Sequence, residues 1–245
     1  MWLTGRLENE SAHDFALRLL KYNIVNLHFP PGSFISSHEL AGKIGVSRTP
    51  LREAMQELER LALLKVFANA GSQISPINYQ QLNELRFIRQ TLDSAAAEAA
   101  CVRITPADYF ELEEMLRAQR HCLEIRQPDQ LMEQDEKFHR RLYSLADMDT
   151  TYGIIEPFRC HFERFRRLNY SAQDDIRLVE EHEGLVEALK IQDKGAAQKI
   201  VSAHFYFSRK DEQVVLDQYP GYFADDYARA DQPARVFESH EAELR

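Results

Sequence analysis

The sequence predicts a mostly helical protein in two parts: a small N-terminal domain of three helices and a β-hairpin, then an all-helical antiparallel bundle. In residues 1–76, Gly and Pro separate short apolar-periodic segments, and a strand-like pattern follows them. After residue 78 that pattern disappears, and amphipathic segments alternate with short breaks, as in antiparallel helix bundles. We therefore expect one domain over residues 1–76, a second over 78–215, and a polar C-terminal tail over 216–245.

The N-terminal domain starts with three predicted helices. Residues 11–27 carry apolar side chains at helical spacing, and the Pro-Pro-Gly sequence at 30–32 stops this helix because proline cannot continue it. Residues 36–44 form a short second helix that starts at one of two serines and ends at Gly45. Residues 47–64 form the third helix, which has a continuous apolar face.

A short hairpin closes this domain. Val66 and Phe67 precede the turn-like Asn-Ala-Gly sequence at 69–71, and Ile74 follows it. Apolar residues on both sides of such a turn are typical of a β-hairpin. Pro76 ends the unit.

Six helices are predicted in the second part, because each amphipathic segment there ends at Pro, Gly, Ser or Asp. They cover residues 78–104, 106–125, 128–146, 150–169, 173–190 and 193–213.

The composition favours a globular protein of the cytoplasm. Hydrophobic residues make up 44% of the chain and charged residues 28%, which is ordinary for a globular protein. No apolar run reaches the roughly 20 residues of a membrane-spanning helix, and the start of the chain lacks a signal-peptide pattern. The 3 cysteines form no CxxC pair, as is usual in a reducing compartment.

The net charge of −9 is unevenly distributed. The chain has 30 Lys+Arg and 39 Asp+Glu; residues 1–78 hold 8 and 7 of these, so the remainder holds 22 and 32. The acidity therefore belongs to the second part. The nearly neutral first part can bind nucleic acid if its cations lie on one face.

A helix–turn–helix pattern with two arginines at the start of its last helix predicts DNA binding. Arg48 and Arg52 are four residues apart and share a face near the end that enters the major groove. Arginine suits bidentate contact with guanine or phosphate, and Thr49 is short enough to approach a phosphate. Gly71 lets the hairpin backbone come close to an adjacent groove. The alternative is a helical hairpin whose arginines only contact solvent.

The segment PPGSFISSHELAGKIGVSRTPLREAMQELERLALL resembles the N-terminal domain of the GntR family of regulators, over residues 11–76. The resemblance implies a winged helix-turn-helix, with the hairpin as the wing, bound to double-stranded DNA. It implies DNA contacts by residues of both helices and the wing: His38, Ser47, Arg48, Thr49, Arg52 and Gly71. Two departures concern the wing and its approach. The chain has Leu-Ala-Leu at 61–63 where the family has Glu-Gly-Leu, and no basic residue precedes Gly71, so we expect weak or backbone-only wing contacts.

One aspartate and three histidines form a candidate metal site in the second part. Asp135 and His139 are four residues apart on one helical face, and His182 and His204 lie on two later helices. Antiparallel helices can bring them to one point, and one carboxylate with three imidazoles suits Zn²⁺ or Ni²⁺. The alternative is a surface pair of Asp135 and His139, with unrelated histidines elsewhere.

The patterns D-x-x-F-H at 135–139, E-H-x-x-L-x-x-A-L at 181–189 and a histidine on the last helix resemble the FCD effector domain of the FadR subfamily, over residues 78–212. The resemblance implies that the four side chains bind a metal whose open positions accept a carboxylate effector. It also implies that Arg89, in the sequence RQTLD, or its neighbour Arg86 pairs with the effector. The alternative for both arginines is an interhelical or solvated ion pair.

These patterns predict a transcriptional regulator and not an enzyme. We expect a homodimer that places two winged helices on a palindromic operator, and a small carboxylate, an organic or sugar acid, that shifts the arrangement of the two. Repression is the expected mode. One alternative is a purely structural metal site. The other is a metal-dependent hydrolase or lyase with Glu181 as acid or base, which the pattern at residues 47–52 disfavours.

Overall fold

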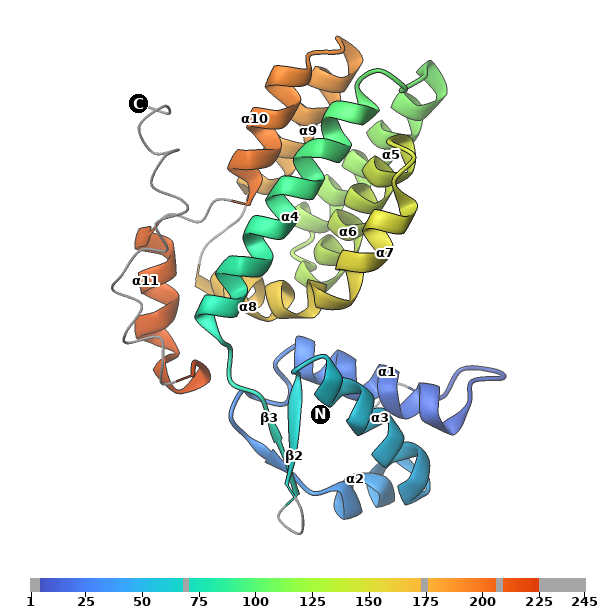
Figure 1. Ribbon diagram of the computed structural model, residues 1–245, viewed down its shortest axis with the longest axis vertical. Coiled ribbons are helices and arrows are strands. Elements are labelled where there is room, and N and C mark those ends of the chain that lie inside the picture. Colours follow the sequence, from blue (N-terminus) through green and yellow to red (C-terminus); the bar gives the residue numbers. More distant parts are fainter. Residues whose placement is uncertain (1–4, 68–70, 173–175, 206–208, 225–245) are drawn as a thin grey trace. The chain divides into compact units, whose positions relative to one another are not determined.

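The computed structural model describes residues 5–67, 71–172, 176–205 and 209–224 (Figure 1). It confirms the predicted class, a small helix-and-hairpin domain followed by a helical one. The chain divides into two compact units, residues 1–84 with the residues from 216 onward, and residues 85–215. We call them the first and the second unit.

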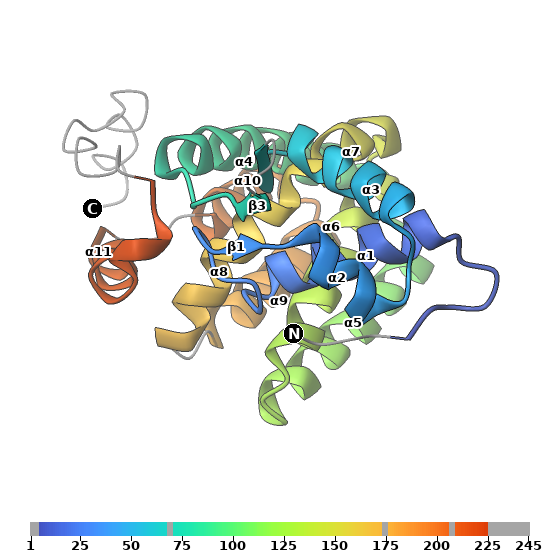
Figure 2. The same ribbon diagram turned by 90° about the horizontal axis from the view of Figure 1, so that it is seen from below.

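The first unit consists of three helices beside a small antiparallel sheet, which Figure 2 shows from below. Its elements are α1 (Ala12–Val25), β1 (Phe34–Ile35), α2 (Ser37–Ile44), α3 (Arg48–Arg60), β2 (Leu64–Phe67) and β3 (Gly71–Ile74). Strand β3 lies between the other two strands. The sequence predicted β2 and β3 but not β1, because two residues with an exposed Phe34 carry no periodic signal.

Leucines of α1 and α3 form the core of the first unit. Leu19, Leu20, Leu51 and Leu58 are all almost completely buried. Their spacing along each helix places them on one face, which fixes α3 against α1. The opposite face of α3 is thereby left to solvent.

The second unit is built mainly from amphipathic helices. They are α4 (Tyr79–Ala100), α5 (Pro106–Glu124), α6 (Pro128–Leu145), α7 (Asp149–Ile155), the 3₁₀ turn η1 (Glu156–Phe158), α8 (Arg159–Ala172), α9 (Ile176–Lys190), α10 (Lys194–His204) and α11 (Arg209–Gln218). Of these, α4, α5, α6, α9 and α10 run side by side in Figure 1. Two helices differ from the prediction. The helix predicted over 150–169 is broken at η1, where Pro157 interrupts helical hydrogen bonding. The last one ends at His204 instead of continuing to 213, and α11 follows separately.

Small residues let the helices of this unit approach closely. Ala96, Ala97 and Ala100 of α4 are fully buried and pack with Phe138 and Leu142 of α6. A dense apolar layer therefore surrounds the polar side chains described below.

The segment after α11 belongs to the first unit. The N–H of Ile77 donates to the carbonyl of Tyr222 at 2.8 Å, and the N–H of Ala224 donates to the carbonyl of Ile77 at 3.0 Å. Phe223 between them is buried. The tail predicted from residue 216 is thus folded as far as residue 224, and residues 225–245 lie outside the described residues.

We expect Gly71→Ala to destabilise the first unit. Gly71 has φ +93°, and a Cβ there would lie 3.1 Å from the carbonyl oxygen of Ile35. Such strain costs roughly 1–3 kcal/mol. Urea unfolding followed by circular dichroism measures it. The matched control is Gly42→Ala in α2, where a Cβ meets nothing within 4 Å and alanine favours the helix by about 1 kcal/mol. Equal unfolding midpoints for the two variants would contradict this account.

Candidate metal centre and nucleic-acid interface

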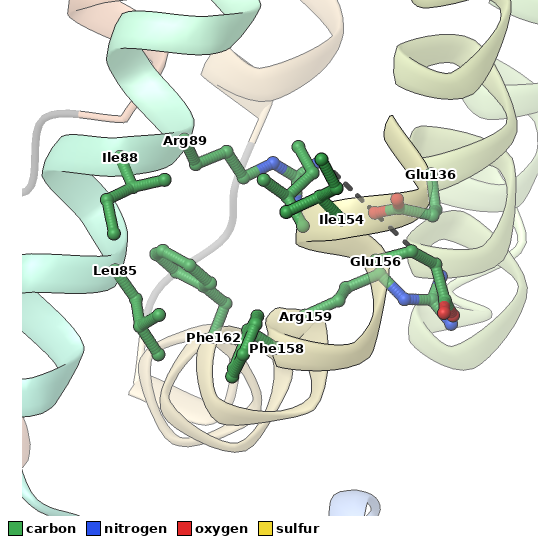
Figure 3. Close-up of a pocket in the computed structure, with 10 residues that line it drawn as sticks. Leu85, Ile88, Arg89, Glu136, Ile154, Glu156, Phe158, Arg159 and Phe162 are labelled. Carbon is green, nitrogen blue, oxygen red and sulfur yellow. Dashed lines mark hydrogen bonds and ion pairs between the residues drawn. The ribbon is translucent and has the colours of Figure 1, made fainter. Parts of the chain in front are cut away.

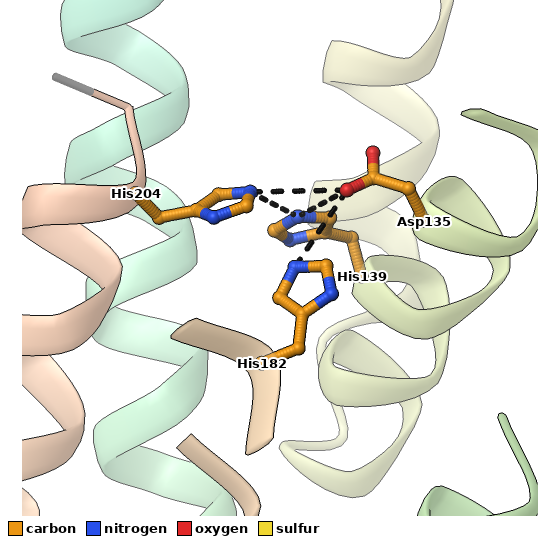
Figure 4. A group of neighbouring side chains, drawn as sticks. All are labelled: Asp135, His139, His182 and His204. Atoms are coloured by element: carbon orange, nitrogen blue, oxygen red, sulfur yellow. Dashed lines mark hydrogen bonds and ion pairs between the residues drawn. The ribbon is translucent and has the colours of Figure 1, made fainter. Parts of the chain in front are cut away.

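Four potential metal ligands meet in the interior of the second unit (Figure 4). Asp135 and His139 lie one turn apart on α6, His182 lies on α9, and His204 is the last residue of α10. Their side chains are 1–7% exposed. The structure therefore brings together the four residues that the sequence analysis grouped.

The four potential ligand atoms have the spacing of a metal coordination shell. The Nε2 atoms of His139 and His204 are 3.2 Å apart. The Oδ1 atom of Asp135 lies 3.8 Å, 3.6 Å and 3.8 Å from the Nε2 atoms of His139, His182 and His204. A tetrahedral shell with bonds of about 2.1 Å has edges of roughly 3.4 Å. The gap at the centre thus fits one transition-metal ion.

Neighbouring side chains orient each imidazole. Nδ1 of His139 lies 2.8 Å from Oδ2 of Asp93 on α4. Nδ1 of His204 lies 2.9 Å from Oε2 of Glu181 on α9. Because carboxylates only accept, the contact with Glu181 favours the tautomer of His204 that has its proton on Nδ1 and a lone pair on Nε2, and a proton on Nδ1 of His139 would face Asp93 in the same way.

The third imidazole is oriented in the same way. Nδ1 of His182 lies 2.7 Å from Oε1 of Gln119 on α5, and the amide nitrogen of Gln119 donates to the carbonyl of Gln134. That second hydrogen bond fixes which way the amide of Gln119 points. Nε2 of His182 therefore also carries a lone pair, and it has no hydrogen-bond partner.

With a proton on each Nδ1, the three Nε2 atoms and the carboxylate of Asp135 would face one another as electron-rich atoms. Oδ1 of Asp135 is buried and accepts no hydrogen bond, while its other oxygen accepts from Arg166 of α8 at 2.6 Å. Buried acceptors without a donor are costly, and a cation between them removes that cost. The donor set and its orientation fit a divalent transition metal.

The pKa shifts of Asp135, His182 and His204 favour the forms that bind a metal. Burial alone raises the pKa of Asp135, but Arg166 and the histidines outweigh it and hold that pKa well below its usual range. Burial and the neighbouring His204 hold the pKa of His182 well below its usual value. Burial and His139 lower the pKa of His204 to about 3. A carboxylate and neutral imidazoles are the forms that bind metal.

The two arginines predicted to meet an effector have protein partners. Arg89 is buried: it lies 3.5 Å from Asp93 and donates to Glu136 at 3.1 Å. Arg86 pairs with Glu212 of α11 at 2.5 Å. Asp93 contacts both Arg89 and His139 and so connects the two side chains.

Sequence reasoning missed the side chains that orient the metal ligands. Asp93 carried a weak signal, since it closes the sequence RQTLD one helical turn after Arg89, and Glu181 is adjacent to His182. Gln119 and Arg166 carried none, because their role depends on how α5 and α8 pack.

The residues proposed for DNA contact lie on the surface of the first unit. Ser47 is the N-cap residue of α3, but its hydroxyl makes no capping bond. His38, Ser47, Arg48, Thr49 and Arg52 are all exposed. Gly71 begins β3, and Asn69 and Ala70, which precede it in the sequence, lie outside the described residues.

The N-terminus of α3 carries positive charge, which the helix dipole disfavours. Its first turn contains Arg48 and no acidic residue, although a helix N-terminus favours negative charge. Within the described residues, neither Arg48 nor Arg52 has an ion-pair partner. Two exposed cations in an unfavourable place are typical of a surface that binds an anion.

The fold defines a class: a helix-turn-helix domain followed by a helical domain, as in DNA-binding regulators. The model of the family "Bacterial regulatory proteins, gntR family" matches residues 13–74, and the model of the family "FCD domain" matches residues 84–207. The chain therefore belongs to the GntR family of DNA-binding transcriptional regulators, in the group with an FCD domain, and is not an enzyme.

Three similar proteins illustrate the family. The HTH-type transcriptional repressor RspR of Escherichia coli (strain K12) is 27% identical over 210 residues, which cover 85% of this chain and 92% of that protein. The Nta operon transcriptional regulator of Aminobacter aminovorans is 30% identical over 214 residues, 86% of this chain and 99% of that protein. The solved structure of E. coli McbR/YncC has a TM-score of 0.70 at 24% identity, covers 85% and 99% of the two chains, and supports the fold.

Among the described residues, no helix combines the length and the apolar character that crossing a membrane requires.

We expect Glu181→Ala to weaken metal binding although Glu181 is not among the four ligands. Without its carboxylate, the imidazole of His204 loses the contact that fixes its tautomer and orientation. Removing such a partner typically lowers metal affinity about 10–100-fold. Competition with a zinc chelator measures the affinity of the purified protein. The neighbouring variant Glu180→Ala removes an exposed carboxylate from the same helix and should leave affinity unchanged. Identical affinities for both variants would show that Glu181 does not position His204.

Proposed function

We propose that this regulator is a metal-dependent repressor whose operator binding is controlled by a small carboxylate. Asp135, His139, His182 and His204 would hold one Zn²⁺ or Ni²⁺ ion. The observation that carries the proposal is the convergence of three imidazole nitrogens and one carboxylate oxygen without a hydrogen-bond partner on a single buried point. When bound, such an ion offers open positions that attract a carboxylate oxygen.

The DNA-contacting role is assigned to the start of α3 and the wing. Arg48 and Arg52 would enter the major groove with Ser47 beside them. Thr49 and His38 would approach phosphates, and Gly71 would let the wing come close to the adjacent groove. Support comes from their exposure and from the two unpaired arginines at a helix N-terminus. A homodimer would place two such surfaces on a palindromic operator, because a two-fold axis in the protein matches one in the DNA.

Arg89 would link the effector to the packing of the bundle. An effector carboxylate that pairs with Arg89 must compete with Asp93 and Glu136, which hold the guanidinium now. Such an exchange would release α6 from α4, and it would also alter the contact between Asp93 and His139. Repression is proposed because the relative RspR is named a repressor. Arg86, paired with Glu212, is assigned a secondary part.

We expect Arg48→Ala and Arg52→Ala each to lower operator affinity by about 1–3 kcal/mol, the value of a base-reading arginine. A duplex selected from a random library by the wild-type protein serves as the probe, in fluorescence anisotropy titrations. Arg60→Ala, at the far end of the same helix, is the matched control and should have little effect. Losing as much affinity with Arg60→Ala as with Arg48→Ala would contradict the assignment.

Removing the metal with a chelator distinguishes a metal site that binds an effector from a metal site that only stabilises the fold. The same duplex is titrated with protein in the presence of small organic and sugar acids, with and without a chelator. We expect at least one acid to release the DNA from the metal-loaded protein and to have no effect once the metal is removed. A protein that loses helical stability on chelation, but whose DNA binding no acid alters, would have a structural metal site only.

A further inference from the structure

A cavity of about 170 Å³ opens in the second unit between α4 and the segment from α7 to α8 (Figure 3). Leu85 and Ile88 of α4 line one side, and Ile155, Phe158 and Phe162 line the other. Of these, Ile88 and Phe158 remain 43% and 41% exposed. Exposed apolar side chains around an opening are unfavourable in water, and an apolar ligand that covers them removes that cost.

The floor of the cavity is polar, and the carboxylate of Glu136 there is hydrogen-bonded to neighbouring side chains. Oε1 of Glu136 accepts from the hydroxyl of Tyr152 at 2.6 Å, and Oε2 accepts from Arg89 at 3.1 Å. Both oxygens therefore already accept a hydrogen bond, and the neighbouring Arg89 and Arg159 offset the charge of Glu136 toward a cationic ligand. Figure 3 shows Arg89 and Glu136 meeting across the cavity.

Arg159 also lines the cavity, and its guanidinium N–H groups are available to a ligand. It lies 3.5 Å from Glu163 and 3.8 Å from Glu136, beyond ordinary hydrogen-bond length, and its side chain is 26% exposed. A guanidinium carries five N–H donors, and within the described residues those of Arg159 make no hydrogen bond. A ligand that fits this wall must accept hydrogen bonds, and a carboxylate matches a guanidinium with two parallel ones.

The cavity is separate from the metal centre. None of the four candidate ligands lines it. Arg89 forms part of its wall and contacts Asp93, which in turn contacts His139, so these two side chains lie between the cavity and the imidazoles. A molecule in the cavity therefore has no need of the metal.

We propose that this cavity is a second ligand site, for an apolar monocarboxylate whose hydrocarbon body fills the cavity and whose carboxylate pairs with Arg159. Cavities of about 150 Å³ take up benzene, so a single ring or a chain of about six carbons is the right size. Sugar acids do not suit the cavity, because the apolar walls leave their hydroxyls without partners. The inference goes beyond the proposed control by metal and does not depend on it.

Isothermal titration of the full-length protein with benzoate, hexanoate, hexan-1-ol and gluconate tests the proposal. The titrations use wild-type protein with and without chelator. We expect saturable binding of benzoate or hexanoate that survives chelation, weaker binding of hexan-1-ol, and none of gluconate in chelated protein. Arg159→Leu should weaken carboxylate binding roughly 10–100-fold, as expected for lost charge-assisted hydrogen bonds.

Leu85→Trp should abolish binding by filling the cavity from a half-buried wall position. The matched control is Arg141→Gln, which removes a guanidinium that pairs with Asp108 and Glu111 away from the cavity. It should bind like wild type. Circular dichroism confirms that each variant is folded.

Three results would overturn the proposal. One is binding that disappears with the metal, which would place the carboxylate at the metal centre instead. The second is binding that both Arg159→Leu and Leu85→Trp leave unchanged. The third is no binding of either apolar carboxylate to folded wild-type protein. The first result would still be compatible with a metal-dependent effector site, so the two proposals fail separately.

Discussion

The second unit depends on the convergence of four electron-rich atoms at a buried point. Three imidazole nitrogens and one carboxylate oxygen lie there, and the Nδ1 atoms on the other side of the three rings face Asp93, Gln119 and Glu181. Lone pairs held this close repel one another in a medium of low dielectric constant, so a positive charge at the centre would stabilise the arrangement. Ligands or their orienting partners come from α4, α5, α6, α8, α9 and α10. One ion would therefore affect the packing of almost the whole bundle.

Under the proposed function, this arrangement would let a small molecule act on a helical domain. A single contact at a bound ion would change the charge balance around Asp135 and the histidines, and the orienting residues would carry that change to the neighbouring helices. Arg89 connects the two candidate sites, because it pairs both with Asp93 beside the candidate metal centre and with Glu136 beside the cavity. A ligand alters operator binding only if it prefers one packing of these helices over another. In the first unit, the arginines at the start of α3 gain nothing from the helix dipole, which is understandable if their role is to meet DNA.

The sequence predicted what local patterns determine. Glycines and prolines marked the helices of the first unit, and the four-residue spacing of Asp135 and His139 placed both on one face of α6. Other features depend on how helices pack, which the chain does not encode locally. The partners of Arg89 follow from the approach of α4 to α6, and Gln119 is an unremarkable polar residue until α5 lies beside α9. Strand β1 is two residues long and forms only because β3 is there to pair with it.

Metal content of the purified full-length protein, measured by elemental analysis after loading and desalting, tests the central claim most directly. The account predicts about one divalent transition-metal ion per chain in the wild type, little in His139→Ala or His204→Ala, and a wild-type content in His121→Ala, which changes an exposed histidine of α5. Wild-type protein that neither carries nor takes up such an ion would contradict the account.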